Sequence, residues 1–295
     1  MILNVSGRTD IIAFYEKWFM NRLNAGFVDV RNPFNHNLVS RINFSDVDLI
    51  LFCTKNPIPI LNDLDKIKIP FIFHVTITPY KNDIEPNVIL KTEIINAVKK
   101  ISTIIGKDNI YIRYDPIFLS DKYNIVYHIK AFNKLCTLLK GYVNTIIVSF
   151  LDEYKNVLKN KNILKYRQFT ENEYKLIGEN FSNIARTNNM VVQTCFEDRN
   201  LTEYGFKKGE CLSHELAYKL TGKTYKSWKA RKERKCECVE MVDIGCYNSC
   251  KHFCKYCYAN YDEKMVNENF KNHDVNSSLL CGNLKKDDII KVRNK

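Results

Sequence analysis

The chain has 295 residues, of which 45% are apolar, and a formal net charge of +12. This length fits one large α/β domain or two smaller ones, and the apolar fraction supports a packed core. No apolar run approaches the roughly 18–20 residues that cross a bilayer, which excludes a helical membrane protein. Because the first residues lack a secretory signal, we expect a cytoplasmic protein with no membrane partner.

Short β-rich runs alternate along the chain with segments whose apolar residues repeat at the helical period. Such alternation predicts parallel strands joined by right-handed crossovers. Eight strands predict a closed (β/α)8 barrel of the TIM type over residues 1–261, and a doubly wound open sheet is the alternative. Residues 262–295, rich in Asn, Asp and Lys, are expected to form a polar C-terminal extension. The predicted strands are 2–6, 27–30, 48–54, 71–78, 109–115, 145–150, 191–195 and 240–245.

Polar residues stand where most of these strands end. In a barrel of this type the chemistry lies at the carboxyl ends of the strands, so Arg113 and Asp115 are candidate catalytic groups. The alternative is a structural ion pair at the barrel rim. Other polar residues at strand ends are Ser6, Arg8, Arg31, Asn32, Thr54, Lys55, Gln193 and Glu197.

Most of the eleven cysteines lie in the last third of the chain. In a reducing compartment, this number favours metal or cluster ligation over disulfides. Cys250, Cys254 and Cys257 have the spacing C-x3-C-x2-C. Structural zinc usually takes four ligands, whereas three closely spaced thiolates suit a 4Fe–4S cluster with one iron left open.

The cysteine segment resembles the signature of radical S-adenosylmethionine (SAM) enzymes, with an aromatic residue, Tyr256, before the last cysteine. The stretch CKYCYAN is similar to the spore photoproduct lyases of that superfamily. The resemblance implies a 4Fe–4S cluster that binds SAM at its open iron and cleaves it to a 5′-deoxyadenosyl radical. It also implies a reductant protein such as flavodoxin or ferredoxin.

Roughly residues 1–260 resemble the bacterial family called domain of unknown function 1848. The resemblance brings an assignment of the cluster site but no known reaction or substrate. It is carried by SGRTDI, RNPF, TKNP, RYDPI, QTCFE and DIGCYNSCKHFCKYCYAN.

The cysteine loop follows the last predicted strand, whereas in radical SAM enzymes it follows the first. A closed barrel places its first and last strands side by side, so the chain is interpreted as a circular permutation of that barrel. Thr9 and Asp10, after the first strand, are then expected to bind the amino group of SAM, because both can accept hydrogen bonds. Asp10 suits an N-cap of the following helix equally well.

Four further cysteines could complete a second site. Cys195 ends the seventh strand, Cys211 lies in the following excursion, and Cys236 and Cys238 form a C-x-C pair. Four thiolates can hold a second 4Fe–4S cluster or a structural zinc ion, and the sequence leaves both open.

The densest basic run, residues 223–235, includes Tyr225 and Trp228. Cations contact phosphates and rings stack on bases, so nucleic-acid contact competes with a solvated connector as its interpretation. The positive charge is compatible with a nucleic acid or an anionic small molecule as partner. A radical SAM-like enzyme is the first hypothesis; the alternatives are a zinc-stabilised nucleic-acid-binding protein and a 4Fe–4S electron carrier.

Overall fold

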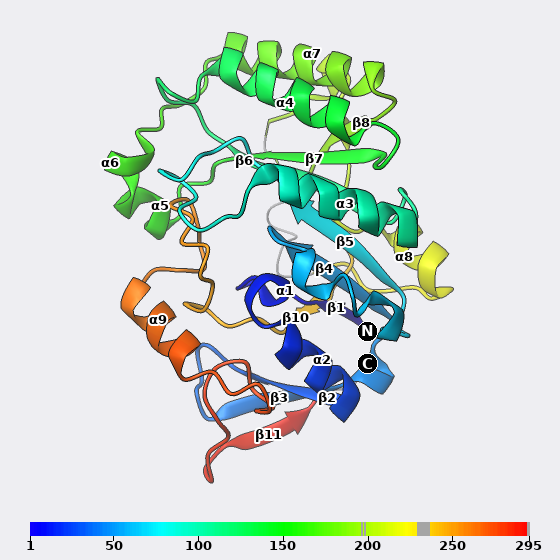
Figure 1. Cartoon of the computed structure of the whole chain (residues 1–295), viewed down its shortest axis with the longest axis vertical. Helices are drawn as coiled ribbons and strands as arrows, with labels where there is room; N and C mark the ends of the chain where they lie inside the picture. The colour runs from blue at the N-terminus through cyan, green and yellow to red at the C-terminus, as the bar shows by residue number, and fades with distance from the viewer. Residues whose placement is uncertain (196, 198, 229–236, 294–295) are drawn as a thin grey trace.

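The computed structural model describes residues 1–195, 197, 199–228 and 237–293. Its centre is an eight-stranded sheet in which every neighbouring pair of strands is parallel. The strands of this sheet are β1 (Ile2–Asn4), β4 (Leu49–Thr54), β5 (Phe71–Thr76), β6 (Ile110–Ile117), β7 (Thr145–Phe150), β8 (Val191–Thr194), β9 (Lys207–Lys208) and β10 (Met241–Asp243). Their order is β10-β1-β4-β5-β6-β7-β8-β9 (Figure 1).

The predicted α/β class and a parallel sheet of eight strands are confirmed, although only seven of the eight predicted strands belong to it and β9 takes the place of the strand at 27–30. The closed barrel is wrong because the sheet is open. Its two edge strands are β10 and β9. β9 has only two residues, both exposed lysines, and offers too little backbone to extend the ladder to β10. The chain segments beside these edges do meet, because the backbone N–H of Val239 donates to the carbonyl of Leu212 at 3.2 Å.

The last strand of the main sheet lies beside the first, as the permutation requires. β10 pairs in parallel with β1, with Ile2 opposite Met241 and Asn4 opposite Asp243. The cysteine loop therefore starts next to the loop that follows β1.

A second, three-stranded sheet has the order β11-β3-β2. β2 (Phe27–Arg31) is antiparallel to β3 (Leu38–Asn43), and β11 (Ile289–Val292) is parallel to β3. The prediction that 27–30 forms the second barrel strand is thus wrong. The connection at 32–37 is long enough for a hairpin and too short for a crossover helix, so the chain returns antiparallel. Arg31 consequently pairs with Asp288 at 2.5 Å.

The helices are α1 (Ile11–Phe14), α2 (Glu16–Ala25), α3 (Lys91–Ile105), α4 (Ile125–Leu139), α5 (Lys155–Lys159), α6 (Lys161–Leu164), α7 (Glu171–Thr187), α8 (His214–Thr221) and α9 (Glu263–Lys271). Short 3-10 turns lie at Phe44–Asp46, Ile58–Ile60, Leu64–Lys66 and Thr202–Tyr204. None of the described helices has the length and apolarity needed to span a bilayer.

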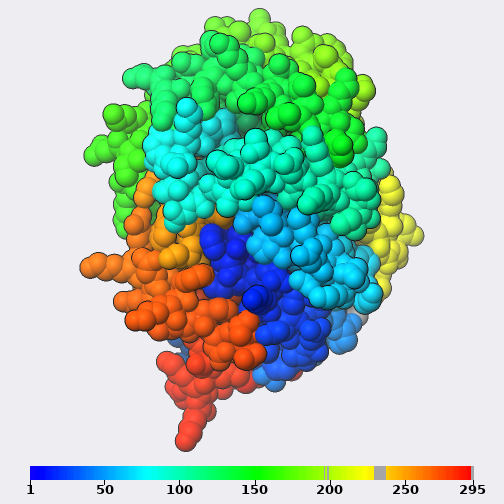
Figure 2. Space-filling model, viewed as in Figure 1, coloured from blue at the N-terminus to red at the C-terminus, as the bar shows by residue number. Residues whose placement is uncertain are grey.

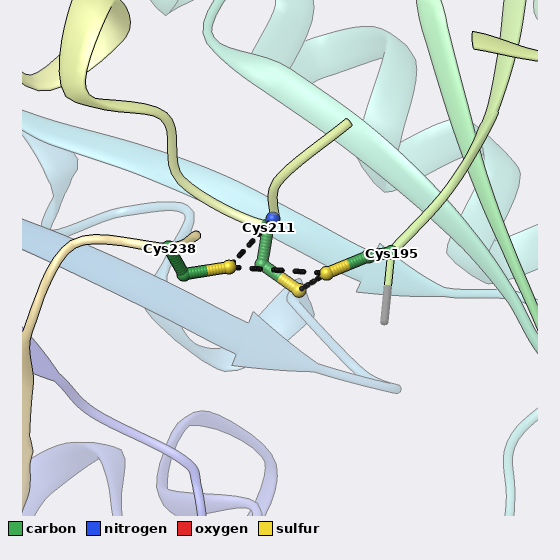
Figure 3. Close-up of side chains that lie close together, drawn as sticks. All are labelled: Cys195, Cys211 and Cys238. Carbon is green, nitrogen blue, oxygen red and sulfur yellow. Dashed lines mark hydrogen bonds between the residues drawn. The ribbon is translucent and has the colours of Figure 1, made fainter. Parts of the chain in front are cut away.

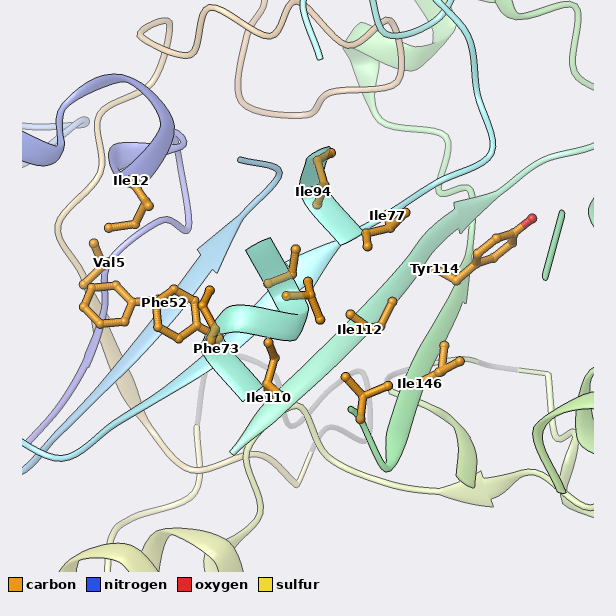
Figure 4. Packing of buried hydrophobic residues seen from close by; sticks show 14 of the residues in the cluster. Val5, Ile12, Phe52, Phe73, Ile77, Ile94, Ile110, Ile112, Tyr114 and Ile146 are labelled. Atoms are coloured by element: carbon orange, nitrogen blue, oxygen red, sulfur yellow. The ribbon is translucent and has the colours of Figure 1, made fainter. Parts of the chain in front are cut away.

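Helices α3, α4 and α7 bury apolar faces in the main core together with the strands. Figure 4 shows Ile94 of α3 with strand residues of this cluster such as Phe73 and Ile112. The rings of Phe132 on α4 and Phe181 on α7 stack with their centroids 3.8 Å apart. Ile94 on α3 packs in the same cluster and is fully buried. Each such side chain contributes about 1.5–3 kcal/mol by leaving water, so this side of the sheet is a rigid support for the strand ends.

The residues after 261 return to the N-terminal part of the chain. Trp18 on α2 donates through Nε1 to the carbonyl of Ser277 at 2.8 Å, and Asn21 donates to the carbonyl of Val275. Figure 2 shows this extension, orange to red, against the blue N-terminal segment. The extension, expected from composition alone, contains α9 and β11.

Candidate metal centres

A cavity of about 660 Å³ lies at the carboxyl ends of the parallel strands. Cys250, Cys254 and Cys257 line it, and so do Cys195 and Cys211 from the second predicted set. Members of both sets therefore face one shared space.

Two asparagines hold the cysteine loop in shape. The side-chain oxygen of Asn248 accepts from the N–H groups of Tyr261 at 2.8 Å and Asp262 at 3.1 Å. Asn248 is fully buried and has a φ of +52°, in the left-handed region that costs most residues energy. The side chain of Asn260 forms hydrogen bonds with both backbone groups of Cys250: it accepts from the N–H and donates to the carbonyl. These contacts fix the backbone that presents the thiols.

Burial raises the pKa of the thiol of Cys250, of Cys254 to about 12, and of Cys257. The ammonium of Lys55 works in the opposite direction at Cys254 and Cys257. Without a bound cation, these thiols stay protonated at neutral pH. Metal ligation replaces their protons, so a cation would be bound with proton release.

Lys55 is fixed beside the cysteine loop by a buried carboxylate. Its Nζ lies 2.9 Å from Oε1 of Glu85, which also accepts from the hydroxyls of Thr78 and Tyr256. Burial disfavours the charge of Lys55, but Glu85 and Cys254 outweigh this effect and its pKa is raised. Tyr256, the aromatic residue of the signature, thus connects the loop to a fixed positive charge.

Both residues proposed for the amino group of SAM line the cavity. Asp10 caps α1 by accepting from the N–H of Ala13 at 3.0 Å. Its second carboxylate oxygen accepts from the N–H of Lys55 at 2.7 Å and lies 2.9 Å from Nε2 of His252. His252 is therefore buried against Asp10 and does not face solvent. The hydroxyl of Thr9 is buried and has no hydrogen-bond partner among the described residues.

Cys195, Cys211 and Cys238 come together in three dimensions, with their ligand atoms all within 4.8 Å of one another (Figure 3). The sulfur of Cys195 lies 2.8 Å from that of Cys211 and 3.9 Å from that of Cys238. Hydrogen bonds with these two neighbours lower the pKa of Cys211, and the guanidinium of Arg113 adds to the effect. These three cysteines can hold a metal ion. Cys236, the fourth predicted member, lies outside the described residues.

Arg113 and Asp115 form the predicted pair and line the cavity. Arg113 donates to Asp115 through Nε at 2.9 Å and Nη2 at 2.5 Å. Its Nη1 donates to the sulfur of Cys211 at 3.2 Å. Asp115 also accepts from the hydroxyl of Ser149. The pair is thus tied to the second cysteine group.

The sequence prediction missed His74, which lies within the apolar run of β5 and lines the cavity. It is 1% exposed, and neither ring nitrogen has a hydrogen-bond partner among the described residues. Burial, and then the charge of Arg113, lower the pKa of His74 to about 3, so the ring is neutral at pH 7. A histidine in an otherwise apolar strand was the available signal.

Both aromatic residues in the described part of the basic run are half-buried, and Trp228 lines the cavity. Tyr225 and Trp228 pack against a small apolar cluster under β1 and β4. Lys223 pairs with Asp48 at 2.5 Å. Residues 229–235 of the run lie outside the described residues. Base stacking on these two rings is therefore not supported by their packing.

An open parallel α/β sheet whose strand ends face a cysteine-lined cavity defines a protein with a candidate metal centre. The chain belongs to the family described as domain of unknown function (DUF1848), whose model matches residues 2–259. No match was found among curated proteins.

Proposed function

We propose that the protein is an iron–sulfur enzyme of the radical SAM type, with a 4Fe–4S cluster on Cys250, Cys254 and Cys257. One observation carries the proposal. The three thiols line a single cavity at the carboxyl ends of parallel strands, in a loop that follows a strand paired with β1.

The residues present fit such a cluster. The three thiols line the cavity, and they do not form a group with all ligand atoms within 4.8 Å, as the other three cysteines do. A multi-iron cluster binds each thiolate through a different iron and separates the sulfurs more than a single ion does. The fixed ammonium of Lys55 would offset part of the negative charge of the thiolates.

A cavity of about 660 Å³ is within the range of roughly 300–1,000 Å³ that drug-sized ligands occupy. It has room for SAM and part of a small substrate. The buried hydroxyl of Thr9 is the available acceptor for the amino group of SAM. Asp10, whose carboxylate already accepts from the backbone at Ala13 and Lys55, would act chiefly by holding His252 and the loop after β4 in place.

When bound, the cluster supplies one electron that cleaves the carbon–sulfur bond of SAM, yielding methionine and, after hydrogen-atom transfer from a substrate, 5′-deoxyadenosine. The electron would come from a reductant protein such as flavodoxin or ferredoxin. Neutral His74 and the Arg113–Asp115 pair line the same cavity and would contact the substrate. The positive charge of the chain leaves an anionic small molecule or a nucleic acid as the substrate class.

The proposal is tested by anaerobic reconstitution with iron and sulfide, followed by incubation with SAM and dithionite. We expect thiolate–iron absorption and the formation of 5′-deoxyadenosine, measured by mass spectrometry. Cys254→Ala should abolish both, whereas Cys136→Ala, which removes a buried thiol on α4, should retain them. Bound iron without SAM cleavage would instead identify an electron carrier.

A further inference from the structure

We propose that Cys195, Cys211 and Cys238 hold a single soft divalent cation of the zinc class, which closes the gap between the two edge strands of the main sheet. This site is separate from the proposed catalytic cluster and does not depend on it.

The spacing of the sulfurs identifies the kind of centre. A tetrahedral ion with thiolate bonds of about 2.3 Å places its sulfurs about 3.8 Å apart. The Cys195–Cys238 distance is 3.9 Å, and all three sulfurs lie within 4.8 Å of one another. The shorter Cys195–Cys211 separation, 2.8 Å, needs to open by about 1 Å for ligation. A second 4Fe–4S cluster would require the three sulfurs to spread much further, because each would bind a different iron.

The surroundings of the sulfurs suit thiolates. Arg113 donates to the sulfur of Cys211 at 3.2 Å, and the N–H of Cys211 donates to the sulfur of Cys238 at 3.2 Å. Outer donors of this kind orient ligands and stabilise their negative charge. Three thiolates and a divalent ion carry one net negative charge, and the guanidinium of Arg113, which also pairs with Asp115, offsets part of it.

The ligands come from the segments that flank the open side of the sheet. Cys195 follows β8, Cys211 follows β9, and Cys238 precedes β10. Beside them the N–H of Val239 donates to the carbonyl of Leu212. An ion at this point would therefore join the edge at β9 to the edge at β10, where the main sheet has no strand ladder among its described residues.

The metal content of protein purified without oxygen, from cells supplied with zinc and iron, tests the inference. We expect about one zinc per chain in the wild type. Cys238→Ser should lose that zinc and keep its iron, and Cys254→Ala should do the reverse. Cys136→Ser is the matched control and should keep both metals. Loss of iron in place of zinc from the Cys238 variant, or a wild type without zinc, would overturn the single-ion site.

If the Cys238 variant does not fold, cobalt binding and hydrogen exchange test the metal site instead. Cobalt added to metal-depleted Cys254→Ala protein should give the strong visible absorption of tetrahedral thiolate-bound Co²⁺. Chelation should also speed amide hydrogen exchange at least tenfold in residues 207–212 and 238–243, with little change in α4. Absence of the cobalt bands refutes ligation, and unchanged exchange in both segments refutes the closing role.

Discussion

Replacing Glu85 by Gln tests how the protein keeps a positive charge beside its cysteine loop. The carboxylate of Glu85 is almost completely buried and accepts hydrogen bonds from Lys55, Thr78 and Tyr256. It also forms an ion pair with Lys91. Glutamine keeps the shape and one acceptor oxygen but removes the charge that compensates two ammonium groups.

The expected loss of stability follows from the pKa of Glu85 and from the usual cost of breaking a buried ion pair. Burial works against the charged form of Glu85, but Lys55 and Lys91 lower its pKa from 4.5 to about 2. That difference corresponds to about 3 kcal/mol of stability. Removing one partner of a buried ion pair costs about 3–5 kcal/mol. The side chain of Lys91 is 30% exposed, so water replaces part of its lost partner and the lower figure applies. For a chain of this size, the melting temperature should fall by about 6 °C.

Thermal unfolding between pH 2 and pH 7 is the assay. A carboxylate whose pKa is lowered by folding stabilises the protein above its unfolded pKa, and that stability is lost as the pH falls through its folded pKa. The wild type should therefore melt about 6 °C above the variant at pH values above 4.5, and this difference in melting temperature should shrink as the pH falls toward 2. Glu179→Gln removes an exposed partner of Lys175 and should cost at most about 0.5 kcal/mol. Equal melting temperatures for wild type and the Glu85 variant at pH 7 would refute the reasoning.

Asn248→Ala should lower the free energy of unfolding by about 2–4 kcal/mol in urea titrations, because two partly buried N–H groups lose their acceptor and alanine is strained at this positive φ. Asn189 is exposed and has a similar φ of +58°, so Asn189→Ala measures only the cost of the left-handed backbone and should lower the free energy of unfolding by about 1 kcal/mol. Equal losses of stability in the two variants would contradict a role for the Asn248 hydrogen bonds. Arg113→Lys should weaken metal retention at the Cys211 site about tenfold in chelator competition, since lysine cannot bridge that thiolate and a carboxylate at once; unchanged retention would show that the bridge is dispensable. Asp10→Asn should cost about 1–3 kcal/mol, because an amide nitrogen cannot accept the hydrogen bonds that the carboxylate oxygen receives, and a melt matching the wild type would argue against its bracing role.

The sequence predicted what depends on local pattern. The apolar runs of β4, β5, β6 and β7 were found because each is long and β-rich, and the pairing of β10 with β1 followed from the order of the motifs. The strand at 27–30 was also recognised, but its partner was not. The short connection at 32–37 makes the chain return as a hairpin to β3. Because the other units alternate strand and helix regularly, the sequence prediction treated this strand as one more unit of the same kind.

What could not be predicted depends on contacts between distant residues. β9 consists of two lysines, and nothing in their pattern distinguishes a strand from a loop. The Lys55–Glu85 pair joins two loops, and the position of Glu85 becomes apparent only when Tyr256 reaches the same carboxylate from the far end of the chain. His252 is buried through another such contact. Its partner is Asp10. The N-cap pattern located Asp10 at the start of a helix but gave no information about the contact of its second carboxylate oxygen.

The pairing of β1 with β10 imposes an order on synthesis. β1 is among the first segments to leave the ribosome, yet one of its edges must wait until residues 241–243 emerge. Until then that edge is an unpaired strand in the interior of the final sheet, where a nascent chain is most exposed to misassembly. The cysteine loop emerges immediately afterwards. Completion of the sheet and placement of the cysteine loop therefore become possible at nearly the same moment. A chain that stalls before β10 can neither finish its sheet nor bring Cys250, Cys254 and Cys257 to the strand ends.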